Sequence, residues 1–322
     1  MDILVADKFP EPYLRELQSK GHRVVFEPDL GADELPGAID GHQALVVRST
    51  RVTAATLEAA SRLELVVRAG AGTNTIDTEG AADKGIFVCN VPGRNAVAVA
   101  ELTLGLLLAL DRQIPDNVLD LRNGRWDKKR YSQARGLYGR SIGIVGLGAI
   151  GMAVAERAAA FGMKIHVVGK AARPAAAQTR LQALGAISVE SLDRLAETCD
   201  VLTFHVPAAA ETKRMVDARL LERLAPQSIV VNTSRGDIVD EDALMAAMDA
   251  KGIRAGLDVY ADEPGGGQAK FDSPLARHPN VYGTHHIGAS TAQAQEAVAQ
   301  GVVEILDAYA RGEVLNCVNR DV

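Results

Sequence analysis

Residues 141–151 read SIGIVGLGAIG, and this stretch decides the fold class. Its apolar first half predicts a strand, its glycines predict a tight turn, and the small residues that follow predict a helix. A second apolar run, residues 164–168, comes directly after that helix. A G-x-G-x-x-G pattern in this strand–helix–strand context is typical of a Rossmann dinucleotide-binding unit.

The three glycines have separate tasks in such a turn. Gly146 permits the turn, Gly148 lets the backbone approach a pyrophosphate, and Gly151 lets the helix pack closely on the strand. The helix start at Ala149 offers free N–H groups and a positive dipole end for phosphates. We therefore predict that this turn binds the phosphates of a dinucleotide.

Short β-branched runs alternate with helical segments on both sides of the turn, which predicts an α/β protein with parallel sheets. We expect two doubly wound domains. A Rossmann domain, residues 94–289, is inserted into a flavodoxin-like substrate-binding domain, residues 1–93 and 290–322. The strands are predicted at residues 3–6, 23–26, 44–47, 65–67, 87–89, 141–145, 164–168, 201–205, 229–232 and 254–259.

Composition excludes several classes of function. The chain has 322 residues and a net charge of −6, which argues against nucleic acid as a partner. Its three cysteines are isolated, so we expect no metal site, no disulfide framework and a reducing, cytoplasmic compartment. The apolar run 96–110 is too short to span a membrane with ease, so a buried or subunit-interface helix is the better interpretation.

The end of the strand at residues 164–168 bears on cofactor choice. A ribose-binding acid is expected about 20 residues after the glycines, but Gly169 and Lys170 stand there, with Arg173 close behind. The two cations would bind a 2′-phosphate that an acid would repel. Of NAD(H) and NADP(H), we therefore favour NADP(H). The alternative is that both are solvated loop cations.

Three polar segments follow predicted strands, at residues 232–239, 257–264 and 284–291. The carboxyl ends of parallel strands meet at one edge of the sheet, so these segments can converge. Oxidation of a hydroxy acid needs a base for the hydroxyl proton and a cation for the carboxylate. Histidine and arginine suit these tasks.

With these segments the chain resembles the D-isomer-specific 2-hydroxyacid dehydrogenase family over nearly its whole length, and within it the phosphoglycerate dehydrogenases most. The resemblance is carried by the glycine turn, the three polar segments, and the runs 67–72, 90–95 and 100–101. It implies that Arg235 anchors the substrate carboxylate, that His286 is the acid/base and that Glu263 is its partner. Further residues are implied to contact the cofactor, namely Ala149, Ile150, His205, Pro207, Thr212, Thr233, Ser234, Asp258 and Gly288.

Simpler readings stand beside these roles. Arg235 could pair with Asp237 or Asp240, and Glu263 could be an ordinary loop acid. His285 and His286 are adjacent, so strand alternation would send them to opposite sides. The family usually has proline at the position of His285, which favours His286 as the acid/base.

The resemblance also bears on the substrate, a small anionic 2-hydroxy or 2-keto acid for which 3-phosphoglycerate is the preferred reading. Residues 124–131 resemble a segment that reaches the neighbouring subunit's site in phosphoglycerate dehydrogenases, which implies a homodimer. The expected substrate-binding residues are Arg48, Arg51, Arg68, Ala69, Gly70, Ala71, Asn95, Lys129 and Arg130.

Several alternatives remain open. NADPH-dependent glyoxylate or hydroxypyruvate reductases share the missing acid at Gly169, and a sulfonated acid such as sulfolactate would suit the cations. A non-catalytic nucleotide sensor is the alternative from another class, although the set Arg235, Glu263 and His286 argues against it. Because the chain ends at Val322, we also expect no C-terminal regulatory domain and no serine feedback through one.

Overall fold

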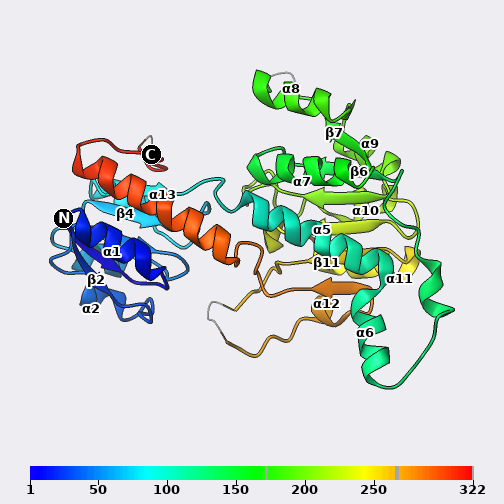
Figure 1. Ribbon diagram of the computed structural model, residues 1–322, viewed down its shortest axis with the longest axis horizontal. Coiled ribbons are helices and arrows are strands. Elements are labelled where there is room, and N and C mark those ends of the chain that lie inside the picture. The colour runs from blue at the N-terminus through cyan, green and yellow to red at the C-terminus, as the bar shows by residue number, and fades with distance from the viewer. Residues whose placement is uncertain (171–172, 265–267, 321–322) are drawn as a thin grey trace. The chain divides into compact units, whose positions relative to one another are not determined.

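The structure is a computed structural model that describes residues 1–170, 173–264 and 268–320. The glycine run at residues 265–267 lies outside the described residues. The chain forms two compact units, Met1–Asn95 with Ser290–Val322, and Ala96–Ala289. Figure 1 colours the chain from blue at the N-terminus to red at the C-terminus.

The first unit is a five-stranded parallel sheet in the order β2-β1-β3-β4-β5. Helices α1 and α13 pack over one face of this sheet, while α2, α3 and α4 pack over the other. This is the doubly wound flavodoxin order. The elements are β1 (Asp2–Val5), α1 (Glu11–Ser19), β2 (Arg23–Phe26), α2 (Leu35–Ala38), β3 (Ala44–Val47), α3 (Ala54–Ala59), β4 (Leu65–Arg68), α4 (Thr78–Asp83), β5 (Phe87–Asn90) and α13 (Ala292–Ala310).

The second unit is a seven-stranded parallel sheet in the order β12-β11-β10-β9-β6-β7-β8. The order reverses between β6 and β9, so this pair forms the switch point at which such sheets bind ligands. The strands are β6 (Ser141–Val145), β7 (Lys164–Val168), β8 (Ile187–Val189), β9 (Val201–Phe204), β10 (Ile229–Asn232), β11 (Arg254–Leu257) and β12 (Val281–Gly283).

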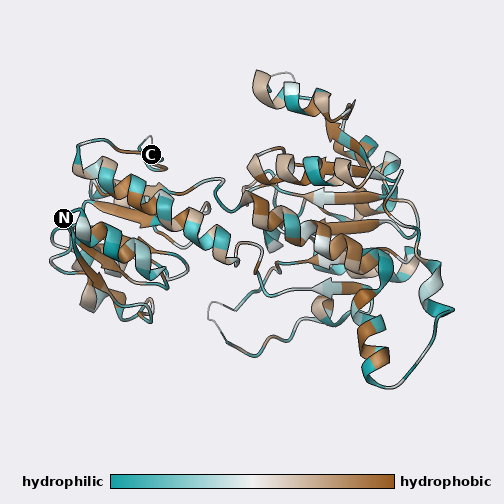
Figure 2. Ribbon diagram, viewed as in Figure 1, coloured by the Kyte–Doolittle hydropathy of each residue, from teal (hydrophilic) through white to brown (hydrophobic). Residues whose placement is uncertain are grey.

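Helices cover both faces of this second sheet. One apolar cluster joins it to α5, α7 and α8, and another joins it to α9, α10, α11 and α12. Figure 2 shows the strands of both sheets as predominantly hydrophobic, as expected of strands covered on two sides. The helices are α5 (Ala96–Arg112), α6 (Ile114–Arg122), α7 (Ala149–Ala160), α8 (Ala175–Ala183), α9 (Leu192–Thr198), α10 (Ala218–Arg223), α11 (Glu241–Lys251) and α12 (Pro274–Arg277).

The predicted fold class, two parallel α/β sheets with a Rossmann domain, is confirmed. Two strands were not predicted. β8 and β12 have three residues each, and β8 is largely exposed, so neither forms an apolar run that a sequence pattern reveals. The apolar run predicted as a buried or interface helix is α5, most of whose side chains are buried. Among the described residues, no helix is long and apolar enough to cross a membrane.

Candidate functional site

The glycine turn after β6 has room for a pyrophosphate. A Cβ on Gly148 would meet no other atom within 4 Å, so the space beside the start of α7 is open. Gly146 has φ +91°, and a side chain there would collide with the His205 carbonyl at the end of β9. A side chain on Gly151 would collide with the Gly146 carbonyl. The turn is therefore narrow on its inner side and open where phosphates approach, and its residues fit a dinucleotide.

His205 lies across the switch point from this turn. Burial lowers its pKa from 6.5 to about 3, so the imidazole is neutral at physiological pH. Nε2 lies 2.9 Å from the Thr203 hydroxyl. Nδ1 is buried and has no hydrogen-bond partner among the described residues. The other predicted cofactor residues near this strand, Pro207 and Thr212, belong to the loop that follows it, in which the Thr212 hydroxyl donates to the Pro207 carbonyl at 2.7 Å.

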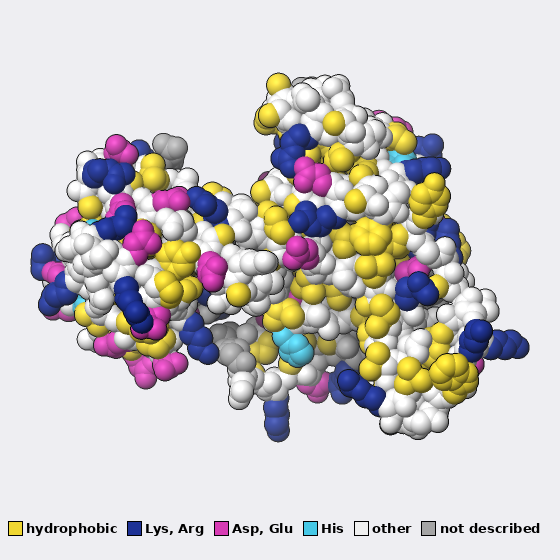
Figure 3. Space-filling view, in the orientation of Figure 1, with side chains coloured by type: hydrophobic (Ala, Val, Ile, Leu, Met, Phe, Trp, Pro, Cys, Tyr) yellow, Lys and Arg dark blue, Asp and Glu magenta, His cyan; other side chains and the backbone are white. Residues whose placement is uncertain are grey.

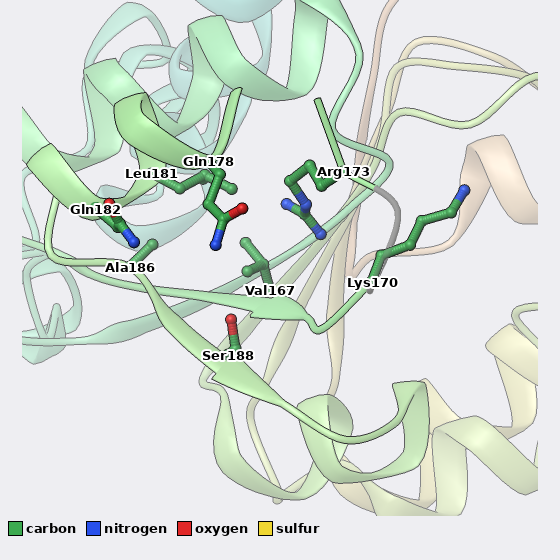
Figure 4. A pocket seen from close by; sticks show the side chains of 8 residues that line it. All are labelled: Val167, Lys170, Arg173, Gln178, Leu181, Gln182, Ala186 and Ser188. Atoms are coloured by element: carbon green, nitrogen blue, oxygen red, sulfur yellow. The ribbon is translucent and has the colours of Figure 1, made fainter. Parts of the chain in front are cut away.

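A pocket of about 280 Å³ lies where β7 ends. Arg173 Nη2 donates to the Val168 carbonyl at 2.9 Å, while Nη1 is buried without a partner among the described residues. In Figure 4 the Arg173 guanidinium lies toward Gln178 and Val167, whereas the Lys170 side chain extends away from them. The lining residues are Val167, Lys170, Arg173, Gln178, Leu181, Gln182, Ala186 and Ser188.

This pocket gives the two predicted cations different settings. Arg173 is half-buried and held by the backbone, and Lys170 is exposed. An acceptor that reached Arg173 Nη1 would satisfy a buried donor, which is a stronger reason for binding than charge alone. No carboxylate is among the described residues that line the pocket, in keeping with Gly169 at the strand end.

The segment after β10 holds Arg235 by a local hydrogen-bond network. The Asn232 side chain accepts from the Ser234 N–H at 3.0 Å and donates to the Arg235 carbonyl at 2.8 Å. Thr233, also in this segment, has its hydroxyl 2.9 Å from the Thr103 hydroxyl on α5. Asp240, one of the alternative partners for Arg235, instead lies 3.8 Å from Arg214 and caps α11. Arg235 is thus fixed at the backbone while its side chain is half-buried.

Glu263 and His286 form a direct pair. Nδ1 of His286 lies 2.6 Å from Glu263 Oε2, and Glu263 Oε1 accepts from the Tyr260 N–H at 3.0 Å. Burial raises the pKa of Glu263, but the hydrogen bond and charge of His286, the Tyr260 N–H and the charge of Arg235 together hold that pKa below 4.5. Glu263 is therefore ionised at neutral pH. Its bond to Nδ1 leaves Nε2 of His286 as the nitrogen free to exchange a proton.

Gly236 brings Arg235 close to this pair. A side chain on Gly236 would collide with the backbone of Tyr260 and Ala261, so the segments after β10 and β11 touch there. The three residues predicted as catalytic thus lie in one unit, at the carboxyl ends of β10, β11 and β12.

A buried carboxylate holds the loop that carries His286. Asp258, which is 1% exposed, follows β11. Its Oδ1 accepts from the Thr284 hydroxyl at 2.6 Å and the Ile287 N–H at 2.8 Å, and its Oδ2 accepts from the Gly288 N–H at 2.8 Å. The His286 N–H also donates to the Asp258 carbonyl. We call Asp258 with residues 284–288 the histidine clamp.

The backbone at the histidine clamp differs from the strand predicted for His285 and His286. His285 and His286 do not alternate along a strand, because β12 ends at Gly283. His286 has φ +51°, in the left-handed region that non-glycine residues rarely adopt. The Asp258 hydrogen bonds hold this conformation. Sequence reasoning missed Thr284, although a hydroxyl two residues before the histidine and an acid at a neighbouring strand end were visible signals.

In the first unit, a second acid organises the loop after β3. Asp7 Oδ2 accepts from the N–H groups of Arg48, Ser49 and Thr50, at 2.6, 3.0 and 3.0 Å. Asp7 Oδ1 accepts from the Ser49 hydroxyl at 2.9 Å. We call this arrangement the Asp7 clamp. Sequence reasoning missed Asp7, and an acid directly after the first strand was the available signal.

Apart from Arg51, which follows β3, the other predicted substrate residues of this unit lie at or just after the ends of β4 and β5. Gly70 has φ +146°, and a side chain there would collide with Arg68, whose Nη1 donates to the Ala69 carbonyl at 3.4 Å. The Ala71 carbonyl accepts from Asn90. Asn95 Oδ1 is buried without a partner among the described residues. Arg51 is exposed.

Lys129 and Arg130 belong to the second unit and are both exposed. Arg130 lies 3.3 Å from Asp120 and 3.8 Å from Asp116, both on α6, and its guanidinium stacks on Tyr131. Arg130 is therefore fixed by its own subunit. Within the described parts of the chain, no group of three or more His, Cys, Asp or Glu residues is arranged to hold a metal ion.

Comparison with known proteins agrees with this geometry. The family model for the NAD-binding domain of D-isomer specific 2-hydroxyacid dehydrogenases matches residues 104–288. D-3-phosphoglycerate dehydrogenase of Methanocaldococcus jannaschii is 39% identical over 98% of this chain, which spans 59% of that relative's length. Hydroxypyruvate reductase of Thermotoga maritima is 38% identical over 94% of this chain and 96% of its own length.

A solved structure of a Thermus thermophilus protein has the same fold, with a TM-score of 0.87 and 32% identity, over 99% of this chain and 100% of that one. The family match covers more than half of the chain, and the hydroxypyruvate reductase matches nearly end to end. The chain belongs to the D-isomer specific 2-hydroxyacid dehydrogenase family.

Proposed function

We propose that the protein transfers a hydride between a nicotinamide cofactor and a D-2-hydroxy acid, with 3-phosphoglycerate and phosphohydroxypyruvate as the substrate pair. The observation that carries the proposal is the 2.6 Å pair of His286 and Glu263, with Arg235 near enough for its charge to lower the pKa of Glu263. A poised acid/base beside a cation is what oxidation of a hydroxy acid requires.

The proton step follows from the orientation of His286. Glu263 accepts a hydrogen bond from Nδ1 and stabilises the imidazolium, so Nε2 takes the hydroxyl proton in oxidation and returns it in reduction. Arg235 binds the substrate carboxylate through its guanidinium. The bound nicotinamide supplies the hydride acceptor or donor. Asp258, Thr233, Ser234 and Gly288 hold the cofactor side of the site together with the glycine turn.

For the cofactor, we propose NADP(H) in preference to NAD(H). Support comes from Gly169, which puts no carboxylate at the strand end to repel a 2′-phosphate, and from Nη1 of Arg173, which has no partner among the residues that the structure describes. Gly169→Asp is expected to shift the ratio of kcat/KM values toward NAD. An unchanged ratio in that variant would remove the loop from cofactor selection. Arg173→Ala, which removes both the phosphate donor and the hydrogen bond to the Val168 carbonyl, should raise KM for NADPH far more than KM for NADH.

The substrate is tested by initial rates at the nicotinamide absorbance band. The panel is 3-phosphoglycerate, glycerate, lactate and sulfolactate, with hydroxypyruvate and glyoxylate in the reverse direction, each with both cofactors. Preference for 3-phosphoglycerate supports the proposal. Binding of cofactor without turnover of any substrate would contradict enzymatic activity and favour a nucleotide sensor. In the same assay, His286→Ala should lose turnover and retain cofactor binding.

A second candidate function is reduction of hydroxypyruvate or glyoxylate with NADPH. It is favoured by the Thermotoga maritima hydroxypyruvate reductase, which matches this chain over nearly the whole length of both. Turnover of hydroxypyruvate or glyoxylate with NADPH, and not of phosphohydroxypyruvate, would establish this function instead.

We also propose that the protein is a homodimer that pairs through α6. This helix buries Asp120 yet exposes Ile114, Val118, Leu119 and Leu121, and Trp126 beyond it is 81% exposed. Figure 3 shows hydrophobic side chains gathered over the part of the molecule where Figure 1 labels α5 and α6. A second copy would cover these side chains. Light scattering should give twice the chain mass, and Leu119→Asp with Leu121→Asp should give the single mass.

A further inference from the structure

Cys89 and Cys317 lie opposite each other although 227 residues separate them in the chain. Cys89 belongs to β5, one of the two edge strands of the first sheet, and Cys317 belongs to the C-terminal segment, which forms an isolated antiparallel bridge with β5. The sequence gives no sign of this pairing, because neither cysteine has a partner nearby in the chain.

The hydrogen bonds around the bridge fix its geometry. The Val318 N–H donates to the Val88 carbonyl, and the Asn90 N–H donates to the Asn316 carbonyl. These bonds flank the cysteines, which are therefore a non-hydrogen-bonded antiparallel pair. The Cα atoms of such a pair lie about 4.5 Å apart, and both side chains project to the same face. That spacing lies within the range of Cα separations seen in disulfides, about 4.4–6.8 Å.

Packing places both thiols in one environment. Cys89 is fully buried and Cys317 is partly buried, and both belong to the apolar cluster between the first sheet, α1 and α13. The Cys317 thiol donates to Asn319 Oδ1 at 3.2 Å. Asn319 in turn accepts from the Val88 N–H and donates to the Ile86 carbonyl, each at 2.9 Å. The segment is thus held in register on β5 by groups other than the cysteines.

We propose that Cys89 and Cys317 are a disulfide-forming pair that covalently fastens the C-terminal segment to β5 when a small-molecule disulfide such as oxidised glutathione is present. The partly exposed Cys317 thiolate attacks one sulfur of that disulfide, and one small thiolate leaves. Cys89 then loses its proton and attacks Cys317 Sγ, and the second small thiolate leaves. Two protein thiols lose two electrons and two protons, and the small disulfide becomes two thiols.

Burial, and then the neighbouring Cys317, raise the pKa of Cys89 to about 12. Little Cys89 thiolate exists at neutral pH, so the second step is slow and accelerates as the pH rises. Cys199 serves as an internal control. It is buried in the second unit, and burial likewise raises its pKa to about 12, but the structure places no other cysteine in that unit.

The test uses the full chain, purified reduced and incubated natively with oxidised glutathione. Alkylation under denaturing conditions then precedes intact-mass measurement and peptide mapping. We expect a mass loss of two hydrogen atoms, one alkylated cysteine and a cross-linked peptide that joins Cys89 to Cys317. Oxidation should raise Tm by a few degrees, because the bond closes a very long loop, and dithiothreitol should reverse this shift.

Matched variants separate this pair from incidental oxidation. Cys199→Ala should form the cross-link and show the Tm shift as the parent chain does. Cys317→Ser, which keeps a donor for Asn319, and Cys89→Ala should show neither. A glutathione adduct on Cys317 with no cross-link, or cross-links that involve Cys199 as often as Cys89, would overturn the proposal. The result is independent of the enzymatic assays, so it stands or fails apart from the proposed function.

Discussion

The histidine clamp, built on Asp258, and the Asp7 clamp have the same hydrogen-bonding arrangement in two different environments. Each is a carboxylate just beyond a parallel strand that accepts several hydrogen bonds from the loop after another strand of its sheet. Asp258 is 1% exposed and fixes a loop whose histidine has a left-handed backbone. Asp7 is partly exposed and fixes a loop with Arg48, whose guanidinium donates to the Ser290 hydroxyl at 3.3 Å.

The roles proposed for the two loops account for this difference. A proton-transfer group needs its ring set within a fraction of an ångström, and a buried clamp in a low dielectric gives that precision. A guanidinium that attracts an anion acts over a longer range and tolerates rotamer freedom. The histidine clamp should therefore affect the catalytic rate, and the partly exposed Asp7 clamp should affect substrate binding.

Removal of the buried clamp should have the largest effect. Asp258→Ala leaves three donors without their acceptor, and the buried one, the Gly288 N–H, alone costs about 1–3 kcal/mol. We expect kcat to fall by about 10²-fold or more, together with a lower Tm. Steady-state kinetics and calorimetry on the same preparation measure both. Unchanged kcat at an unchanged Tm would contradict the role of the clamp in positioning His286.

A smaller change to the histidine clamp distinguishes an effect on the position of His286 from an effect on folding. Thr284→Val removes one 2.6 Å hydrogen bond to Asp258 and keeps the shape of the side chain. We expect kcat to fall by about tenfold with little change in KM, since hydrogen bonds to charged groups contribute about 1.5–3 kcal/mol. Thr284→Ser keeps the hydroxyl and should restore the rate. If valine and serine behave alike, the hydroxyl has no part in the clamp's function.

Removal of the Asp7 clamp should affect KM more than kcat, the opposite of what we expect for the histidine clamp. Asp7→Ala frees the backbone of residues 48–50, and we expect KM for the anionic substrate to rise by about fivefold while kcat stays within twofold. Measurements at low and high salt should show the larger difference at low salt, where the cations attract the anion more strongly. A loss of kcat as large as that in Asp258→Ala would break the distinction between the two clamps.

The smallest expected effect is on the way Tm depends on pH. The pKa of Glu263 is held below its ordinary value of 4.5, so the stability that this carboxylate adds is present above pH 4.5 and is lost as the pH falls through its folded pKa. Tm of the parent chain should exceed that of Glu263→Gln at neutral pH, and the two should converge in acid. Curves that stay parallel down to about pH 3 would show that the pair with His286 does not stabilise the fold.

Sequence patterns predicted both sheets because their central strands are apolar runs and their glycines mark turns. They missed β8 and β12, because a strand of three residues is too short to show an alternation of apolar and polar residues. Candidate residues at strand ends were found because parallel strands end at one edge. The strand-alternation argument for His285 and His286 was wrong, because the local backbone there depends on Asp258, which is distant in sequence. Asp7, Thr284 and the approach of Cys89 to Cys317 depend on packing in the same way.

The discontinuity of the first unit has a consequence for how the protein is made. One apolar cluster of that unit depends on Val302, Val303, Ile305 and Leu306 of α13, which leaves the ribosome only after the whole of Ala96–Ala289. Until then only α1 packs on that face of the five-stranded sheet. The second unit, by contrast, has already been synthesised with all of its helices. Nascent chains should therefore complete the second unit first, and the uncovered sheet is the surface that a chaperone would bind during synthesis.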